Sequence, residues 1–210
     1  PMTAFKTIKG VPVKTISGNR AGASFEGQLY YDSDGVGIFK FVGALGAGTW
    51  ASGGAMNTAR EGTAGVGTQT AALNSTGYAS TGIVGVNESY DGSSWTELGD
   101  VNTARSFGSA SGTQGVSLYA TGATAGSNNN RVTNVETWDG SSWTEIADVN
   151  TAKYYSGTTG NAPATSNINF GGQGDNTTGI VNTENYDGTS WTEVADLNLG
   201  RRTRGIGDSS

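Results

Sequence analysis

Residues 90–98 read YDGSSWTEL, and the same pattern returns as WDGSSWTEI at residues 138–146 and as YDGTSWTEV at residues 186–194. A weaker first copy ends at residues 48–50, which read GTW. The tryptophans that mark the four copies are 45, 48 and 48 residues apart, which predicts an internal repeat. The aromatic and acidic positions of this signature are Trp50, Trp95, Trp143, Trp191, Tyr90, Trp138, Tyr186, Asp91, Asp139 and Asp187.

A second marker keeps the same period and ends in a basic residue. It reads MNTAR at residues 56–60, VNTAR at 101–105, VNTAK at 149–153 and LNLGR at 197–201. Its basic positions are Arg60, Arg105, Lys153 and Arg201. Because two markers share one spacing, we assign residues 50–210 to a repeat region with a period of about 48 residues.

Each repeat unit has the pattern of short β-strands. The Asp-Gly pair between an aromatic residue and the downstream Trp is typical of a hairpin turn, since Gly accepts positive φ. Val135, Thr137 and Ile146 beside one such turn are β-branched. No segment shows the apolar spacing of an amphipathic helix. The sequence therefore predicts an all-β protein with about four strands in each unit.

The order of residues in a unit resembles the kelch repeat. A basic residue is followed by a small apolar strand, a Gly-Gly pair, a strand ending in Tyr-Asp, a turn and a Trp, best seen from Lys153 through residues 170–172 to Trp191. The Gly-Gly pair is replaced by Thr76-Gly77 or Thr81-Gly82 in one unit and by Thr121-Gly122 in another. The resemblance implies a β-propeller in which Trp95, Trp143 and Trp191 pack against neighbouring blades.

Three complete units are too few for a six- or seven-bladed kelch ring, so the ring needs a further means of closure. Strands expected at residues 28–31, 36–42 and 49–53 could combine with residues 201–207 into a composite fourth blade. Four blades is the lower end of propeller sizes. Alternatively, several chains complete one assembly, or the repeats continue in a longer array.

The N-terminal region resembles a segment that recurs in bacteriophage fibre and virion-appendage proteins. The resemblance rests on EGQLYY at residues 26–31, IFKFV at residues 38–42, and GTW at residues 48–50 leading into residues 57–60. It implies a virion protein with an extended attachment arm over residues 1–25, a hairpin region over residues 26–49 and outward-facing repeats. It also implies assembly in the host cytoplasm, contact with other virion proteins, and a homo-oligomer.

The composition argues against most catalytic mechanisms. The chain has no His and no Cys, which removes Ser-His-Asp systems, thiolate chemistry and His- or Cys-based metal sites. Twelve of the eighteen acidic residues recur at equivalent repeat positions, which we attribute to turns, caps and solubility. A catalytic carboxylate pair would come from exceptions such as Glu61 or Asp175. We therefore expect no enzyme, no catalytic residues and no cofactor.

Three further kinds of feature have both a structural and a functional interpretation. Residues 32–35 and 174–176 carry oxygen ligands for calcium but also suit ordinary turns. The basic cluster of Arg201, Arg202 and Arg204 suits an acidic partner surface better than nucleic acid. The Asn/Gly-rich loops at residues 126–130 and 171–179 are candidates for binding a host glycan or protein, or are mere connectors.

Charge and hydropathy limit the partners. Residues 50–210 carry seven basic and fifteen acidic residues, which argues against broad nucleic-acid binding. No run of apolar residues is long enough to span a membrane, and no signal-peptide core is present. Pro1 implies that an initiator Met was removed or not recorded.

Three functions follow as hypotheses. The first is a tail or head fibre that attaches by its N-terminal region and displays the repeats for host recognition. The alternatives are a capsid decoration protein and a carbohydrate-active enzyme on a propeller scaffold.

Overall fold

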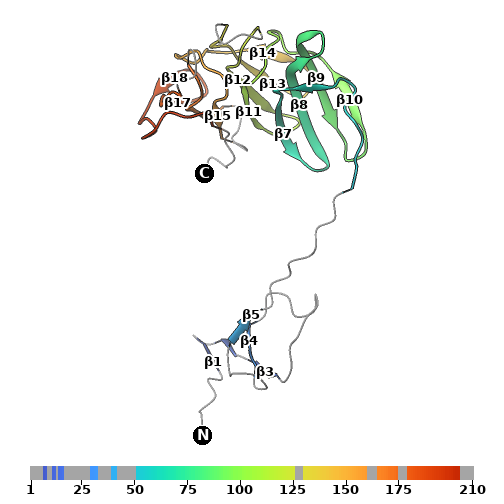
Figure 1. Ribbon diagram of the computed structural model, residues 1–210, viewed down its shortest axis with the longest axis vertical. Helices are drawn as coiled ribbons and strands as arrows, with labels where there is room; N and C mark the ends of the chain where they lie inside the picture. Colours follow the sequence, from blue (N-terminus) through green and yellow to red (C-terminus); the bar gives the residue numbers. More distant parts are fainter. Residues whose placement is uncertain are drawn as a thin grey trace. The chain divides into compact units, whose positions relative to one another are not determined.

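The computed structural model describes residues 51–125, 130–159, 165–174 and 179–203, together with five short strands before residue 42. The chain divides into two compact units, Pro1–Ser52 and Gly53–Ser210, and each is described by itself (Figure 1). This division lies close to the predicted start of the repeats at residue 50.

The first unit contains two small sheets. Strands β1 (Thr7–Ile8) and β2 (Val11–Pro12) pair antiparallel. In the second sheet, β4 (Leu29–Asp32) pairs antiparallel with β5 (Phe39–Phe41) and parallel with β3 (Lys14–Ile16). The sequence pattern indicated the β4–β5 hairpin, but the parallel partner β3 falls in the segment that we expected to be an extended arm.

The second unit begins with a sheet that we call sheet 1. Its strands are β6 (Arg60–Glu61), β7 (Ala64–Thr68), β8 (Ala71–Ala79), β9 (Gly82–Tyr90) and β10 (Trp95–Leu98). Both β6 and β7 pair with β8, so they form one interrupted first strand, with Gly62 at the break. The order is then β8, β9 and β10, all antiparallel.

Sheets 2 and 3 repeat this plan with four strands each. Sheet 2 consists of β11 (Ser109–Gly112), β12 (Ser117–Ala120), β13 (Val135–Trp138) and β14 (Trp143–Glu145). Sheet 3 consists of β15 (Gly157–Thr158), β16 (Asn167–Phe170), β17 (Thr183–Tyr186) and β18 (Trp191–Glu193). In each sheet, neighbouring strands along the chain pair antiparallel.

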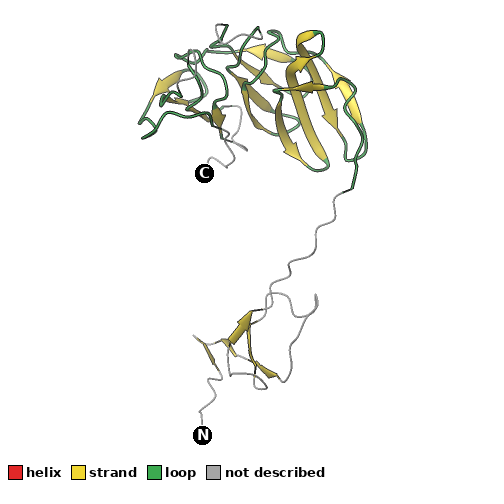
Figure 2. Ribbon diagram, in the orientation of Figure 1, coloured by secondary structure: helices red, strands yellow, loops and turns green. Residues whose placement is uncertain are grey.

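The described residues form strands, turns and loops without any helix, which confirms the all-β prediction (Figure 2). None of the described residues therefore provides a helix able to cross a membrane. Strands β7, β11 and β15, which begin the three sheets, lie next to one another in turn. The three repeats thus pack side by side through their first strands.

In sheets 2 and 3, the aromatic pair packs against the sheet before it. Trp138 and Trp143 of sheet 2 share a buried cluster with Ala64 and Leu73 of sheet 1. In the same way, the rings of Tyr186 and Trp191 of sheet 3 pack in a cluster with buried apolar residues of sheet 2 and the segment after it, namely Leu118, Ala120, Val135 and Val149. Burial of aromatic rings supplies most of the hydrophobic stabilisation in such a small interface. The periodic Trp residues therefore join adjacent repeats.

The Asp-Gly hairpins have the conformation that the sequence predicted. Asp139 Oδ1 accepts bonds of 2.8 Å from the N–H groups of Ser141 and Ser142, and Gly140 has φ of +97°. The N–H of Ser142, the hydroxyl of Ser141 and the N–H of Ser141 lower the pKa of Asp139 to about 2. Gly92 and Gly188 have the same φ at the corresponding turns.

The structure also decides which residues replace the Gly-Gly pair in sheet 1. Thr76-Gly77, Thr121-Gly122 and Gly171-Gly172 all have positive φ, whereas Thr81-Gly82 belongs to the β8–β9 turn. The N–H groups of Gly77, Gly122 and Gly172 donate to the carbonyls of Arg105, Lys153 and Arg201 in the following repeat. A Cβ at Gly122 would lie 2.8 Å from the Ser106 carbonyl oxygen, so this contact requires glycine.

Candidate functional site

The two sequence markers meet in a buried ion pair. We call residues 57–60, 102–105, 150–153 and 198–201 the first to fourth lead segments. In the second, Arg105 pairs with Glu136 on β13, and both side chains are fully buried. The same carboxylate accepts from the Asn102 N–H at 2.8 Å, from Asn102 Nδ2 at 2.9 Å and from the Thr103 N–H at 3.2 Å. Each lead segment that precedes a complete sheet binds the glutamate of that sheet's third strand in this way.

Arg105 also satisfies backbone carbonyls around it. Its Nε donates to Thr121 O at 2.9 Å and its Nη2 to Tyr119 O at 3.1 Å. The guanidinium lies 4.3 Å from the centre of the Tyr119 ring, which adds a cation–π contact. Arg60 makes the equivalent bonds to Thr76 O and Asn74 O in sheet 1. The basic residue therefore ties its lead segment to the second and third strands of the sheet.

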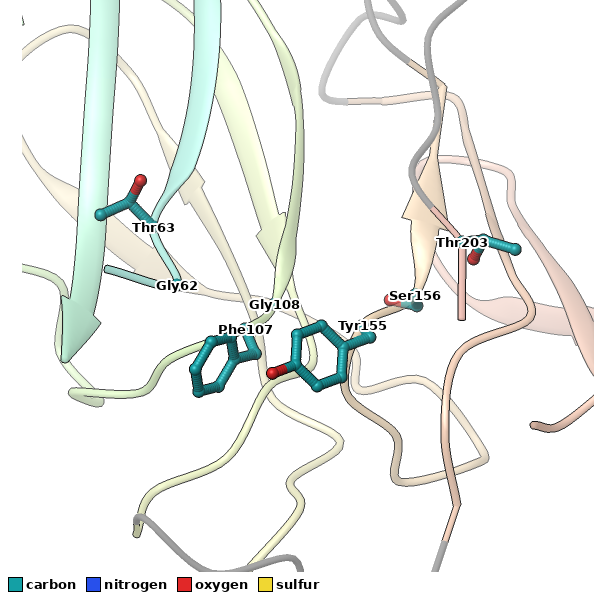
Figure 3. A pocket seen from close by; sticks show the side chains of 7 residues that line it. All are labelled: Gly62, Thr63, Phe107, Gly108, Tyr155, Ser156 and Thr203. Carbon is teal, nitrogen blue, oxygen red and sulfur yellow. The ribbon is translucent and has the colours of Figure 1, made fainter. Parts of the chain in front are cut away.

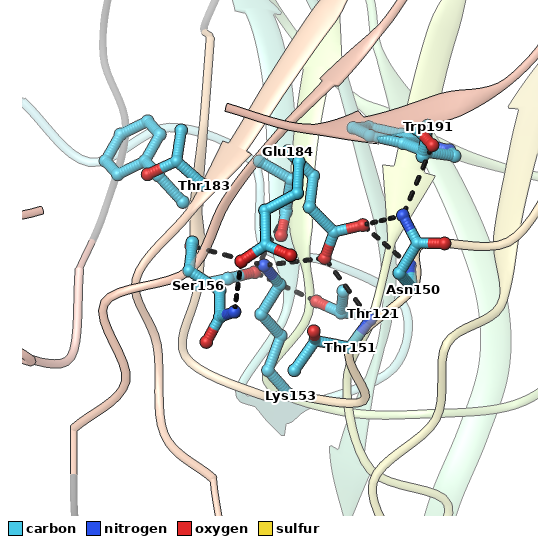
Figure 4. Close-up of polar contacts among 12 residues, drawn as sticks. Thr121, Asn150, Thr151, Lys153, Ser156, Thr183, Glu184 and Trp191 are labelled. Carbon is cyan, nitrogen blue, oxygen red and sulfur yellow. Dashed lines mark hydrogen bonds and ion pairs between the residues drawn. The ribbon is translucent and has the colours of Figure 1, made fainter. Parts of the chain in front are cut away.

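The third repeat carries lysine at this position. Lys153 Nζ lies 3.3 Å from Glu184 Oε1, and Figure 4 shows Lys153 and Asn150 converging on this carboxylate. Asn150 Nδ2 also donates to the Trp191 carbonyl at 3.2 Å, so the lead segment spans the third and fourth strands. Burial lowers the pKa of Lys153, an effect that Glu184 only partly offsets.

We expect Lys153→Arg to raise the free energy of unfolding by about 1 kcal/mol. Within the described residues, Lys153 has one backbone bond besides its ion pair, to Asn182 O at 3.5 Å, whereas Arg105 donates to three carbonyls. Urea denaturation of both proteins measures the change, with Arg105→Lys as the reciprocal variant, expected to be destabilised. An unchanged or lower stability of Lys153→Arg would contradict this view of the site.

Acid should weaken the ion pair of sheet 1. Burial acts to raise the pKa of Glu88, but the bonds from Arg60, Asn57 and Thr58 outweigh it and hold the pKa below 4.5. A carboxyl group with a lowered folded-state pKa stabilises the fold at neutral pH and loses that contribution as the pH falls through the folded pKa. We therefore expect the free energy of unfolding to decline below pH 4.5. The decline should be smaller in Glu88→Gln, whereas parallel pH curves would contradict this assignment.

The recurring acids thus have structural partners, and one expectation about them was wrong. Glu88, Glu136 and Glu184 are buried ion-pair members rather than turn, cap or solubility residues. Other recurring acids accept hydrogen bonds from surface side chains. Asp148 Oδ2, for example, accepts one from the Thr133 hydroxyl at 2.9 Å. Among the described residues no group of three or more His, Cys, Asp or Glu could hold a metal ion. Glu61 is exposed, and Asp175 lies outside the described residues.

A ladder of backbone hydrogen bonds connects the four repeats at one end of the first strands. The Phe107 N–H donates to Gly62 O at 2.7 Å, Tyr155 N–H to Phe107 O at 2.7 Å, and Thr203 N–H to Tyr155 O at 2.9 Å. These residues each stand two positions after the basic residue of a lead segment. Equivalent positions of four successive repeats therefore lie together.

A small cavity lies at this ladder. It has a volume of about 30 Å³ and is lined by residues of all four repeats, as Figure 3 shows: Gly62, Thr63, Phe107, Gly108, Tyr155, Ser156 and Thr203. This volume is on the scale of one water molecule. A larger ligand would contact the rings of Phe107 and Tyr155 rather than enter between them.

Phe107 and Tyr155 have a backbone conformation that favours glycine. Their φ angles are +58° and +52°, close to the +63° of Gly62 at the same repeat position. A non-glycine residue in this region costs about 1–3 kcal/mol and is often retained for function. The two half-buried rings lie 4.7 Å apart, and a Cβ on Gly62 would collide with the Phe107 ring. The second and third repeats thus carry an aromatic residue at a position where the backbone conformation favours glycine.

The predicted binding loops leave the sheets beside these rings. Ala123 pairs with Ser106 and Arg131, and Gln173 pairs with Tyr154 and Gly179. Both connections join the second and third strands of their sheets, directly next to Phe107 and Tyr155. Residues 126–129 and 175–178 themselves lie outside the described residues. We call the rings of Phe107 and Tyr155, with the two loop bases, the axial face.

The basic cluster at residues 201–204 is divided by the structure. Arg202 belongs to the axial face, since its guanidinium lies 4.7 Å from the centre of the Tyr155 ring and its Nε donates to Gln173 Oε1. Arg201 is exposed in the fourth lead segment, and Arg204 lies outside the described residues. Phe107 and Tyr155 were not predicted from the sequence. Aligning the residues two places after each basic position places them with Gly62 at one repeat position, but does not reveal their backbone conformation.

The first repeat differs from the others in the packing of its aromatic pair. Tyr90 and Trp95 have ring centres 5.0 Å apart and are only half-buried, whereas Trp143 and Trp191 are 8% and 6% exposed. Trp95 Nε1 donates to Gly54 O at 3.1 Å, as Trp191 Nε1 does to Ala147 O at 2.9 Å. Trp50 lies outside the described residues.

Comparison with known proteins adds no family. No protein-family model matches the chain, and no curated protein matches it.

Proposed function

We propose that this chain is a bacteriophage virion structural protein, a tail or head fibre that recognises the host surface through its repeats. The observation that carries this proposal is the axial face, where Phe107 and Tyr155 have positive φ beside the bases of two Asn/Gly-rich loops. Strained aromatic residues on a rigid scaffold, next to surface loops, are typical of a recognition surface. The N-terminal unit would attach the protein to other virion proteins.

We further propose that the repeats form a kelch-like propeller of about four blades. Supporting this, four equivalent positions line one cavity and the first strands of the three sheets adjoin in turn. The fourth lead segment would supply the first strand of the fourth blade. Association with further copies would complete the ring.

A non-catalytic role agrees with the placement of the acids. The three most buried carboxylates form ion pairs, with Arg60, Arg105 and Lys153 respectively. Aromatic rings together with amide-rich loops suit a host glycan or protein, whereas the acidic repeat region opposes nucleic acid. We accordingly propose binding rather than turnover at the axial face.

Replacing both Phe107 and Tyr155 with glycine should abolish binding of the purified protein to host cells while leaving it folded. Glycine suits the positive φ at both positions, as Gly62 shows, so we expect a stability change of no more than about 1–2 kcal/mol. Fluorescently labelled protein on host cells measures binding. Tyr78→Ser is the matched control, since Tyr78 on β8 is 39% exposed and is not one of the residues that line the cavity. Undiminished binding by the double variant would overturn recognition through the axial face.

A further inference from the structure

Arg202 is held in one conformation at the axial face although it is exposed. Its guanidinium lies 4.7 Å from the centre of the Tyr155 ring, and its Nε donates to Gln173 Oε1. Gln173 is fully buried, and its backbone is fixed by two hydrogen bonds with Tyr154, of 2.8 and 3.3 Å. The buried amide and the aromatic ring therefore hold a positive charge at a defined point of the surface, which lowers the entropy cost of binding through it.

The Nη groups of Arg202 are donors without acceptors. Within the part of the chain that the structure describes, neither an ion pair nor a hydrogen bond involves them. Gln173 Nε2, on the same amide that binds Arg202, is buried and likewise has no acceptor among the described residues. A guanidinium presents its N–H groups as a planar fork that matches two oxygens of a carboxylate or phosphate. This end of the axial face therefore suits an oxyanion.

The rings beside Arg202 form a shallow apolar platform. Phe107 and Tyr155 are half-buried with ring centres 4.7 Å apart, and the Tyr154 ring supports Tyr155 from 4.7 Å. The cavity at this face has a volume of only about 30 Å³, so a ligand lies on the rings rather than inserting a side chain (Figure 3). A protein partner is typically anchored by side chains that fill pockets. A flat pyranose ring, which packs its C–H groups on an aromatic face, fits this platform better.

We propose that the axial face binds an acidic sugar residue of a host glycan, with its oxyanion on the Nη groups of Arg202 and its ring against Phe107 and Tyr155. This inference rests on the proposed function and names the ligand class of the same site. The oxyanion is the carboxylate of a sugar acid or the phosphate of a sugar phosphate, since both accept two parallel N–H bonds. Glu61, which is exposed, stands beside Gly62 at the opposite end of the hydrogen-bond ladder, so the oxyanion is directed to the Arg202 end.

The charge of the repeats restricts the ligand further. Residues 50–210 carry fifteen acidic residues against seven basic ones, so the surrounding field repels a polyanion. One arginine can neutralise one acidic sugar at a time. A glycan in which an acidic residue is flanked by neutral sugars therefore fits the axial face better than a uniformly acidic polymer.

Two pairs of sugars that each differ in one group test the proposal on the full chain. Cellobiouronic acid carries a carboxylate where cellobiose carries a hydroxymethyl group, and glucose 6-phosphate with glucose is the equivalent pair for phosphate. Titrations followed by NMR chemical shifts of the protein detect binding even at millimolar dissociation constants. We expect an acidic sugar to bind at least about tenfold more tightly than its neutral counterpart. The acidic sugar that shows this preference identifies the oxyanion.

Variants of the two neighbouring arginines show whether Arg202 is responsible. Arg202→Gln should reduce the preference to less than about twofold, because it removes the charged fork and leaves the rings in place. Arg202→Lys should keep only part of the preference, since lysine is a point charge without a planar fork. Arg201→Gln is the matched control, because it removes the same charge from the adjacent exposed position and should keep the full preference.

Four results would overturn the proposal. They are equal binding of acidic and neutral sugars, no binding of either acidic sugar, an equal loss in Arg202→Gln and Arg201→Gln, and tighter binding of the tripeptide glycyl-glutamyl-glycine than of both acidic sugars. The host-cell assay distinguishes this failure from failure of the proposed function. If the double glycine variant of Phe107 and Tyr155 loses host-cell binding while Arg202→Gln keeps it, the axial face recognises the host without an acidic sugar. Undiminished binding by the double variant overturns recognition through this face itself.

Discussion

Replacing Arg105 with methionine should lower the free energy of unfolding by about 3–5 kcal/mol. The substitution leaves the carboxylate of Glu136 buried without its cation, and both side chains are 0% exposed in the native protein. It also removes the donors to Thr121 O and Tyr119 O inside sheet 2. Chemical denaturation followed by tryptophan fluorescence measures the loss.

Two further variants separate the ion pair from general effects of charge removal. Arg201→Met removes an exposed arginine for which the described part of the chain shows no side-chain hydrogen bond or ion pair, and it should change stability by no more than about 0.5 kcal/mol. The double variant Arg105→Met with Glu136→Leu should cost less than the two single changes together, because it no longer buries a lone charge. Additive losses in that cycle would contradict a direct coupling between these two residues.

Replacing Trp191 with alanine should cost about 3–5 kcal/mol, because it opens a cavity between sheets 2 and 3. The ring packs in one cluster with Leu118 and Val135 of sheet 2, and its Nε1 bond to Ala147 O is lost as well. The same measurement on Trp95→Ala provides an internal control. Since Trp95 is only half-buried at the edge of sheet 1, we expect it to cost less than half as much.

Equal costs at Trp191 and Trp95 would contradict the assignment of the two residues to different environments. They would indicate that another part of the protein covers Tyr90 and Trp95 as fully as sheet 2 covers Trp191. The difference in destabilisation between Trp191→Ala and Trp95→Ala therefore measures two things. One is the strength of packing between repeats, and the other is the solvent exposure of the aromatic pair of sheet 1.

Local sequence signals predicted the strands well because the repeat combines turn chemistry with regularly placed aromatic residues. The Asp-Gly pairs correctly predicted the hairpins between the third and fourth strands. The Trp residues correctly predicted contacts between neighbouring sheets. The interrupted first strand of sheet 1 was not foreseen, since it depends on the left-handed conformation of Gly62 and on pairing with β8. Parallel pairing of β3 with β4 was missed because nothing local in residues 14–16 specifies a partner.

The ion pairs were harder to predict than the strands. Arg105 and Glu136 are 31 residues apart, and each alone reads as a surface charge of a polar repeat. Only the folded sheet shows that both markers serve one carboxylate site and that Asn102 belongs to it. The αL conformations of Phe107 and Tyr155 could not be predicted from the sequence either, because aromatic residues rarely adopt positive φ.

The most direct test of the proposed function is cryo-electron microscopy of the purified phage particles, in which this chain is located by its repeated four-stranded sheets. We predict density that projects from the tail or head, attached through the N-terminal unit, with Phe107 and Tyr155 exposed at the outer surface. Density tiling the capsid would identify a decoration protein instead. Absence of the chain from the particles would contradict the virion assignment altogether.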